Sequence, residues 1–180
     1  MYKVFVFFII SVHLNCFGQR IPDSWLGHYK GMMELFSVKE TPVAMVPVEF
    51  KLSKLTQDSS WQYQMIYGEK GKPGFVEKNY TIELKLDTLV MNEGDGIKIR
   101  MRRMGECLFD FYTITGESET FMSSIMCHQN NGDIEFNLFG GSLNQTEVTS
   151  ITVAEDNGAF GLSTYPVSFN QHVIFKKINQ

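Results

Sequence analysis

The feature that most constrains the fold is a strict alternation of apolar and polar side chains, which recurs from Trp25 onward. Residues 48–53 read Val-Glu-Phe-Lys-Leu-Ser, and residues 80–85 read Tyr-Thr-Ile-Glu-Leu-Lys. Because successive side chains of a strand point to opposite faces, each such segment has one face to bury and one to expose to water. This pattern is typical of antiparallel sheets. No stretch of twelve residues shows helical spacing, so the sequence predicts an all-β protein.

Turn-forming residues separate the alternating segments at short intervals, as in Asn130-Asn131-Gly132 and Gly140-Gly141. Short connections between successive strands predict an up-and-down meander, and closing the meander removes its exposed edges. We therefore expect a single antiparallel up-and-down β-barrel of about ten strands. The expected strands are 26–37, 46–55, 60–68, 76–87, 96–104, 107–115, 119–129, 133–139, 145–154 and 171–178.

The expected turns also predict which residues face each other across the hairpins. Turns centred on Gly105, on Glu117 and at Asn131-Gly132 give the pairs Met101–Phe109, Ile99–Phe111, Phe109–Ile125, Cys107–Cys127, Ile125–Leu138 and Cys127–Phe136. All three hairpins then keep one apolar face, which we expect to be buried. The same register places Cys107 opposite Cys127 on the inward face, where a cross-strand disulfide and two buried thiols both remain open.

The first residues read as a signal peptide rather than as part of the fold. Lys3 precedes the apolar run 4–12, and Cys16 and Gly18 supply small residues at the expected cleavage site. We therefore divide the chain into a signal peptide, 1–18, and a barrel domain, 19–180, exported to the periplasm or the extracellular space. The residues before Cys16 do not favour lipid anchoring, and no later apolar run is long enough to span a membrane.

Composition and motifs narrow the function without naming a reaction. The chain is 43% hydrophobic with a formal charge of −4, which excludes a disordered chain and argues against nucleic-acid binding. Its histidines lack metal-site spacing, and no Cys-x-x-Cys, nucleophile elbow or phosphate-binding glycine loop occurs. We therefore assign no catalytic residue, no metal site and no cofactor, and we expect a binding protein more than an enzyme.

A hollow interior is the main functional expectation. Eight strands enclose a space that side chains just fill, so ten strands leave more room. Nine of the ten methionines follow residue 18, and methionine suits an adaptable apolar lining. We also expect Arg103 to point inward near the barrel mouth and bind a ligand carboxylate. The candidate ligand-binding residues are Phe50, Trp61, Tyr63, Met65, Tyr80, Ile99, Met101, Arg103, Phe109, Phe111 and Phe136.

The segment Trp25-Leu26-Gly27-His28-Tyr29-Lys30-Gly31 opens the first expected strand. It resembles the Trp/Gly opening of the calycin-like barrels, which include lipocalins and fatty-acid-binding proteins, although the lipocalin order is Gly-x-Trp. This resemblance implies that residues 19–180 form a lipocalin-like barrel with an internal ligand site. The spacing Trp-x-Gly-x-x-x-Gly is also similar to the start of nitrobindin-type haem-binding barrels, which implies haem ligation by a histidine near the C-terminus, here His172.

The sequence is consistent with three functions. The first is an exported, non-catalytic barrel that binds a small apolar or amphipathic molecule in its interior. The second is a barrel-type enzyme or haem-binding barrel that uses His172 or His28, which approach each other if the last strand lies next to the first. The third is an envelope protein-interaction module with a filled barrel, whose loops 68–75 and 156–170 bind a partner.

Overall fold

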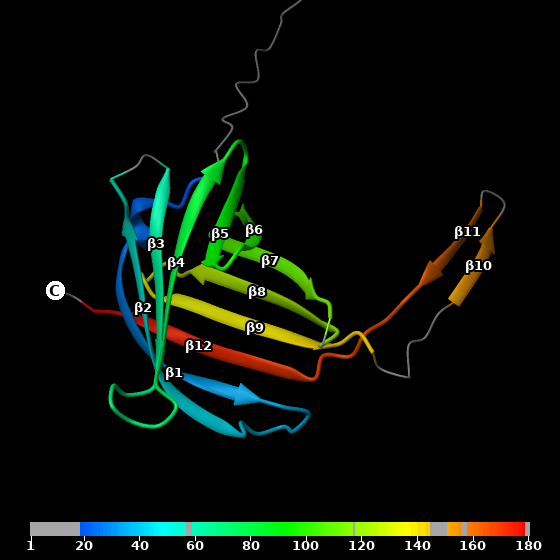
Figure 1. Ribbon diagram of the computed structural model, residues 1–180, viewed down its shortest axis with the longest axis horizontal. Coiled ribbons are helices and arrows are strands. Elements are labelled where there is room, and N and C mark those ends of the chain that lie inside the picture. Colours follow the sequence, from blue (N-terminus) through cyan, green and yellow to red (C-terminus); the bar gives the residue numbers. More distant parts are fainter. Residues whose placement is uncertain (1–18, 57–58, 117, 145–150, 156–157, 179–180) are drawn as a thin grey trace, which may run out of the picture.

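A computed structural model describes residues 19–56, 59–116, 118–144, 151–155 and 158–178, which are built almost wholly from antiparallel strands (Figure 1). After the short 3₁₀ helix η1 (Asp23–Trp25) come β1 (Gly27–Phe36), β2 (Ala44–Lys54), β3 (Ser60–Tyr67), β4 (Val76–Lys85), β5 (Thr88–Gly94), β6 (Ile97–Met104), β7 (Cys107–Ile114), β8 (Thr120–His128), β9 (Ile134–Ser142), β10 (Ile151–Glu155), β11 (Gly158–Leu162) and β12 (Phe169–Lys177). Within the described residues, no helix is long and apolar enough to cross a membrane.

Ten of these strands form one closed barrel in the order β1-β12-β9-β8-β7-β6-β5-β4-β3-β2. Strands that follow one another in sequence pair as antiparallel neighbours, and β12 closes the barrel against β1. Strands β10 and β11 form a separate two-stranded sheet, inserted between β9 and β12 (Figure 1). The all-β class, the antiparallel pairing and the closed ten-stranded barrel are therefore confirmed. The predicted signal peptide, residues 1–18, lies outside the described residues.

The strand count agrees only because one omission offsets one error: β5 is missing from the expected strands, and the expected strand 145–154 does not belong to the barrel. The expected strand 76–87 matches β4 except at its end, because Leu86 and Asp87 form a tight turn that leads into β5. Leu86 has a φ of 55° and is 97% exposed. Both properties are uncommon for a branched apolar residue, so a turn at this position could not be predicted from residue type. The expected strand 145–154 overlaps β10, which lies outside the barrel, and its first six residues lie outside the described residues.

Two of the three predicted hairpin registers are wrong by one residue. Strands β6 and β7 meet through a two-residue turn in which Gly105 has a φ of 60°, so Met101 pairs with Asp110 rather than with Phe109. Two-residue turns are the commonest hairpin connection, and a glycine at positive φ suits them.

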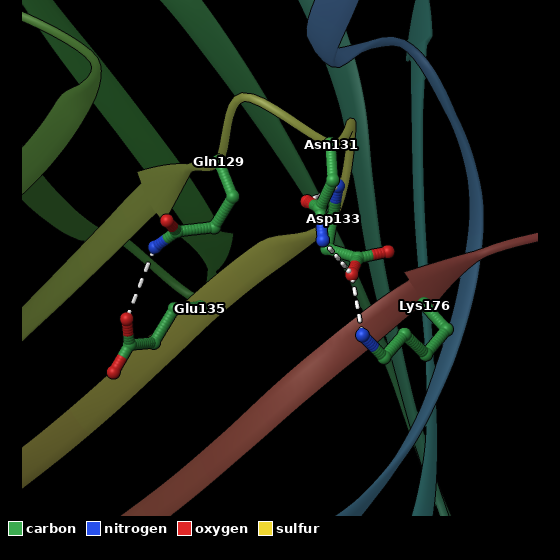
Figure 2. Close-up of polar contacts among 5 residues, drawn as sticks. All are labelled: Gln129, Asn131, Asp133, Glu135 and Lys176. Carbon is green, nitrogen blue, oxygen red and sulfur yellow. Dashed lines mark hydrogen bonds and ion pairs between the residues drawn. The ribbon is translucent and has the colours of Figure 1, made fainter.

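Strands β8 and β9 meet through residues 129–133 rather than through a two-residue turn. Figure 2 shows why this longer loop holds: Asn131 donates to the Asp133 carboxylate at 2.7 Å, and Lys176 of β12 binds the same carboxylate. Gln129 also donates to Glu135 at 3.0 Å across the base of the loop. Met126 therefore faces Phe136, where the sequence predicted Cys127.

The two register errors together exchange the inward and outward faces of β7 and β8, while the pairing between these two strands stays as predicted. The predicted pairing of Cys107 with Cys127 is correct, and a disulfide joins them with their Cα atoms 4.0 Å apart. Their side chains nevertheless have the outward parity, because Leu108 and Asp110 are the buried residues of β7. The prediction that this cysteine pair lies on the inward face was therefore wrong.

The end of the barrel where β1 begins is closed by residues 19–26, and we call it the closed end. Trp25 is fully buried there, stacks on His128 with ring centroids 5.7 Å apart and donates to Glu106. The side-chain amide of Gln19 makes two hydrogen bonds with the backbone of Arg103, which fastens the incoming chain to β6. The opposite end, where β3, β5 and β7 finish, is the open end.

Candidate ligand-binding cavity

The barrel interior is filled near the closed end and hollow towards the open end. The filled half contains an aromatic cluster in which Phe50 contacts the rings of Tyr29, Tyr63 and Phe175 at centroid distances of 5.7, 4.9 and 5.6 Å. The hollow half holds a cavity of about 220 Å³. Its lining comes from β3 to β9 and comprises Tyr63, Met65, Tyr67, Tyr80, Met91, Glu93, Ile99, Met101, Asp110, Tyr112, Met122, Ser124, Met126, Phe136 and Leu138.

Six of the eleven residues proposed from the sequence line this cavity, namely Tyr63, Met65, Tyr80, Ile99, Met101 and Phe136. Phe50 and Trp61 are fully buried but do not line it. Arg103 is the residue before the last one of β6, so it lies at the closed end, away from the cavity. The expectation that Arg103 points into the barrel mouth is therefore wrong in its location.

Phe109 and Phe111 do not line the cavity, because the one-residue shift at Gly105 turns them to the outer face. Phe111 is 66% exposed, and its ring stacks on Phe121. Tyr165, from the segment that precedes β12, also contacts Phe121, with ring centroids 6.2 Å apart. Residues 163–169 do not appear in the cavity lining.

The histidines predicted as alternative ligands also lie outside the barrel. His28 approaches Glu49 at 2.7 Å, and His172 lies between Glu34 and Glu135 at 3.5 and 3.4 Å. Strand β12 is next to β1 as predicted, but His172 faces Glu34, six residues along β1 from His28. The two histidines therefore do not approach each other.

Sequence reasoning missed the polar groups of the cavity. Asp110 is 7% exposed, and its carboxylate accepts hydrogen bonds from the backbone N–H and the hydroxyl of Ser124 on the neighbouring strand. Glu93 of β5 enters the same lining. The signal that could have found Asp110 is its pairing across β7 and β8, because Asp110 and Ser124 share the parity that the wrong register assigned to solvent.

Both carboxyl groups are less acidic than surface carboxyls. Burial raises the pKa of Asp110, and the hydrogen bonds from Ser124 only partly oppose the rise. Burial also raises the pKa of Glu93, against the attraction of Lys78, and the charge of Asp110 raises it further. Neither carboxylate makes an ion pair with any residue that the structure describes, so the cavity has two acids and no paired cation.

Four tyrosines and five methionines provide most of the remaining lining. Burial raises the pKa of Tyr80 and of Tyr112 to about 12, so these phenols stay neutral. Tyr63 is 6% exposed, and its hydroxyl has no hydrogen-bond partner among the described residues, although protein atoms do not fully cover the oxygen. The Tyr63 hydroxyl therefore borders the open space of the cavity, available to a molecule placed there.

Larger hollows, of about 730, 760 and 380 Å³, lie on the outside of the barrel. The first lies beside loop 68–75, and the second borders His28 and Lys177 at the closed end. Some charged groups around them are already paired, as in the contact of Lys30 with Glu49 at 2.8 Å. We assign the candidate site to the interior cavity, because its buried carboxyl group, Asp110, has no counter-ion among the described residues.

The comparisons with known proteins do not identify a function, so the assignment of the site rests on the geometry of the structure. No protein-family model matches the chain, and no curated protein matches its sequence significantly. Among the described residues, no group of three or more histidine, cysteine, aspartate or glutamate side chains is placed to hold a metal ion.

Proposed function

We propose that this protein is an exported, non-catalytic β-barrel that binds a small amphipathic molecule inside its hollow half. The observation that carries the proposal is the contrast between the lining and the rest of the interior. Apolar methionine and aromatic surface surrounds a few convergent polar groups, which is the usual composition of a small-molecule site. Residues 1–18 act as the signal for export in this proposal.

The size of the cavity limits the ligand. At about 220 Å³ it is smaller than the roughly 300–1,000 Å³ of typical drug-sized pockets, so it suits a compact molecule. Flexible methionine side chains can move aside for a somewhat larger one. Tyr67, Glu93 and Tyr112 are partly exposed near the open end, which provides the route of entry.

The geometry gives less support to the two alternatives. A haem or catalytic site based on His28 or His172 has no access to the cavity, because both side chains lie on the outer face. A module with a filled barrel does not account for the hollow half. The calycin-like family remains a proposal, supported by the closed barrel and by the burial of Trp25 at one end.

Native mass spectrometry after gentle purification tests the proposal, together with titration of an apolar fluorescent probe. Two neighbouring residues of β9 provide a matched pair of variants, since Leu138 lines the cavity and Phe139 has the opposite parity. Leu138→Trp should fill the cavity and abolish probe binding, whereas Phe139→Trp should leave it unchanged. A protein that carries no co-purifying molecule, and whose probe binding is the same in both variants, would refute the proposal.

A further inference from the structure

The carboxyl groups of the cavity lining are not balanced by any basic side chain in that lining, among the described residues. Its two ionisable acids, Asp110 and Glu93, face the same space from β7 and β5. No lysine, arginine or histidine belongs to the lining in the part of the chain that the structure describes. Lys78 of β4 acts on Glu93 from outside the lining, and Asp110 has no comparable neighbour.

Burying a carboxylate without a counter-charge is costly, so such a group calls for an explanation. The Asp110 carboxylate is not loosely placed, because Ser124 holds both of its oxygens, at 2.9 Å through the backbone and at 2.5 Å through the hydroxyl. Two neutral donors fix the orientation of the carboxylate but leave its charge without a counter-ion. The arrangement resembles half of an ion pair whose other half is absent from the described residues.

Aromatic faces next to the acids supply the second element of a cation site. Tyr63 and Tyr80 are stacked with ring centroids 6.0 Å apart, and Tyr67 and Tyr112 complete the tyrosine lining. The faces of such rings attract cations, most strongly where water is excluded. Tyr63, a lining residue that is 6% exposed, adds a hydroxyl that has no hydrogen-bond partner among the described residues.

Other ligand chemistries fit less well. An anionic head group would meet two carboxylates, and the resulting repulsion would oppose binding. A wholly apolar ligand would leave both acids without a counter-ion and the Tyr63 hydroxyl without a hydrogen bond in a drier cavity. A compact cation with an apolar body satisfies the acids, the rings and the methionines together.

We infer that the ligand of this cavity is a small organic amine, whose ammonium group lies between Asp110 and Glu93 and whose apolar body packs on the tyrosines and methionines. This inference rests on the proposed function, because it assigns the chemistry of the ligand to the same cavity. Asp110 is the main counter-ion, and Glu93 adds a second negative charge nearer the open end.

Three probes of similar size and different charge test the inference: 2-phenylethylamine, 2-phenylethanol and phenylacetate. Isothermal titration calorimetry on the purified protein at neutral pH should rank the amine first by about tenfold or more over the alcohol, the advantage expected for a charge-assisted hydrogen bond. Phenylacetate should bind most weakly. Equal affinities for amine and alcohol overturn the inference.

Charge-neutral variants locate the effect. Asp110→Asn keeps the shape and an acceptor for the Ser124 N–H, so the fold should persist, and the amine should lose about tenfold in affinity while the alcohol loses little. Glu93→Gln should cause a smaller loss. Glu40→Gln, at an exposed loop position, removes the same charge as a control and should change nothing.

The same titrations separate the inference from the proposed function. If all three probes bind alike and Leu138→Trp blocks them all, the cavity binds ligands but has no preference for amines, and only the inference fails. Failure of the amine to bind while the apolar fluorescent probe still does has the same meaning. If no probe binds the unmodified protein at all, the proposed function fails as well.

Discussion

The two halves of the barrel interior contain the same types of side chain but differ in how these side chains are packed and paired. In the closed half, the hydroxyl of Tyr29 donates to the Trp25 carbonyl at 2.8 Å, and Phe50 is enclosed by other rings. In the hollow half, the hydroxyl of Tyr63 has no partner among the described residues, and Asp110 has no counter-ion. Among the described residues, the closed half also contains two buried polar atoms without a partner, Trp61 Nε1 and His128 Nε2. The two halves therefore differ in packing and charge: rings fill the closed half, whereas the hollow half keeps open space beside a buried carboxylate. The difference therefore indicates that the closed half provides stability and the hollow half provides binding.

The largest expected effect comes from truncating one phenylalanine in each half. Phe50→Ala should lower the free energy of unfolding by about 3–5 kcal/mol, because the ring is fully buried among Tyr29, Tyr63 and Phe175. Phe136→Ala should cost clearly less, because one side of Phe136 faces the cavity and already lacks neighbours. Urea denaturation of both variants measures the difference. Equal losses would mean that the two halves are packed alike.

The architecture could be predicted from the sequence because the alternation has a large and repeated signal. Strand β4 carries its apolar residues at one parity only, so its buried face follows directly. Strand β7 differs, since Cys107, Phe109 and Phe111 at one parity compete with Leu108 and Tyr112 at the other. Apolar content alone therefore does not decide which face of β7 is buried.

The lengths of the turns decide which face of β7 is buried. Turn length depends on local backbone angles and hydrogen bonds, which the periodicity of the sequence does not reveal. The two-residue turn at Gly105 and the loop 129–133, held by Asp133 and Lys176, each move the register by one residue. Those two shifts bring Asp110 and Ser124 inside and turn Phe109 outside. The apolar half of the site was therefore accessible to sequence reasoning, whereas its acidic half depended on two turns.

A smaller effect is expected from removing one tyrosine hydroxyl in each half. Tyr29→Phe should cost about 1 kcal/mol, because it deletes a buried hydrogen bond and leaves the Trp25 carbonyl without its donor. Tyr63→Phe removes a hydroxyl that has no partner among the described residues, so it should be neutral or slightly stabilising. Thermal unfolding of the two variants provides the comparison. A comparable loss in Tyr63→Phe would show that its hydroxyl is satisfied in the free protein.

The smallest effect concerns the pH dependence of stability. Burial raises the pKa of Asp110 above its ordinary 3.8, so the folded state holds a proton at pH values where the unfolded state has released it. Asp110 therefore opposes folding at neutral pH, and this cost diminishes as the pH falls through the raised pKa towards 3.8. Glu93, which shares the cavity and also has a raised pKa, contributes in the same direction.

Asp110→Asn should accordingly stabilise the ligand-free protein slightly at neutral pH and flatten its stability profile in the acidic range, even as it weakens amine binding. The opposite trends of Asp133 and Glu49, whose pKa values are lowered by Lys176 and Lys30, are present in both proteins and cancel in the difference. Urea denaturation at a series of pH values, with Glu40→Gln as the control, measures the two profiles. Parallel profiles would mean that the Asp110 charge is already compensated in the free protein, and the contrast between a stabilising half and a binding half would then lose its electrostatic basis.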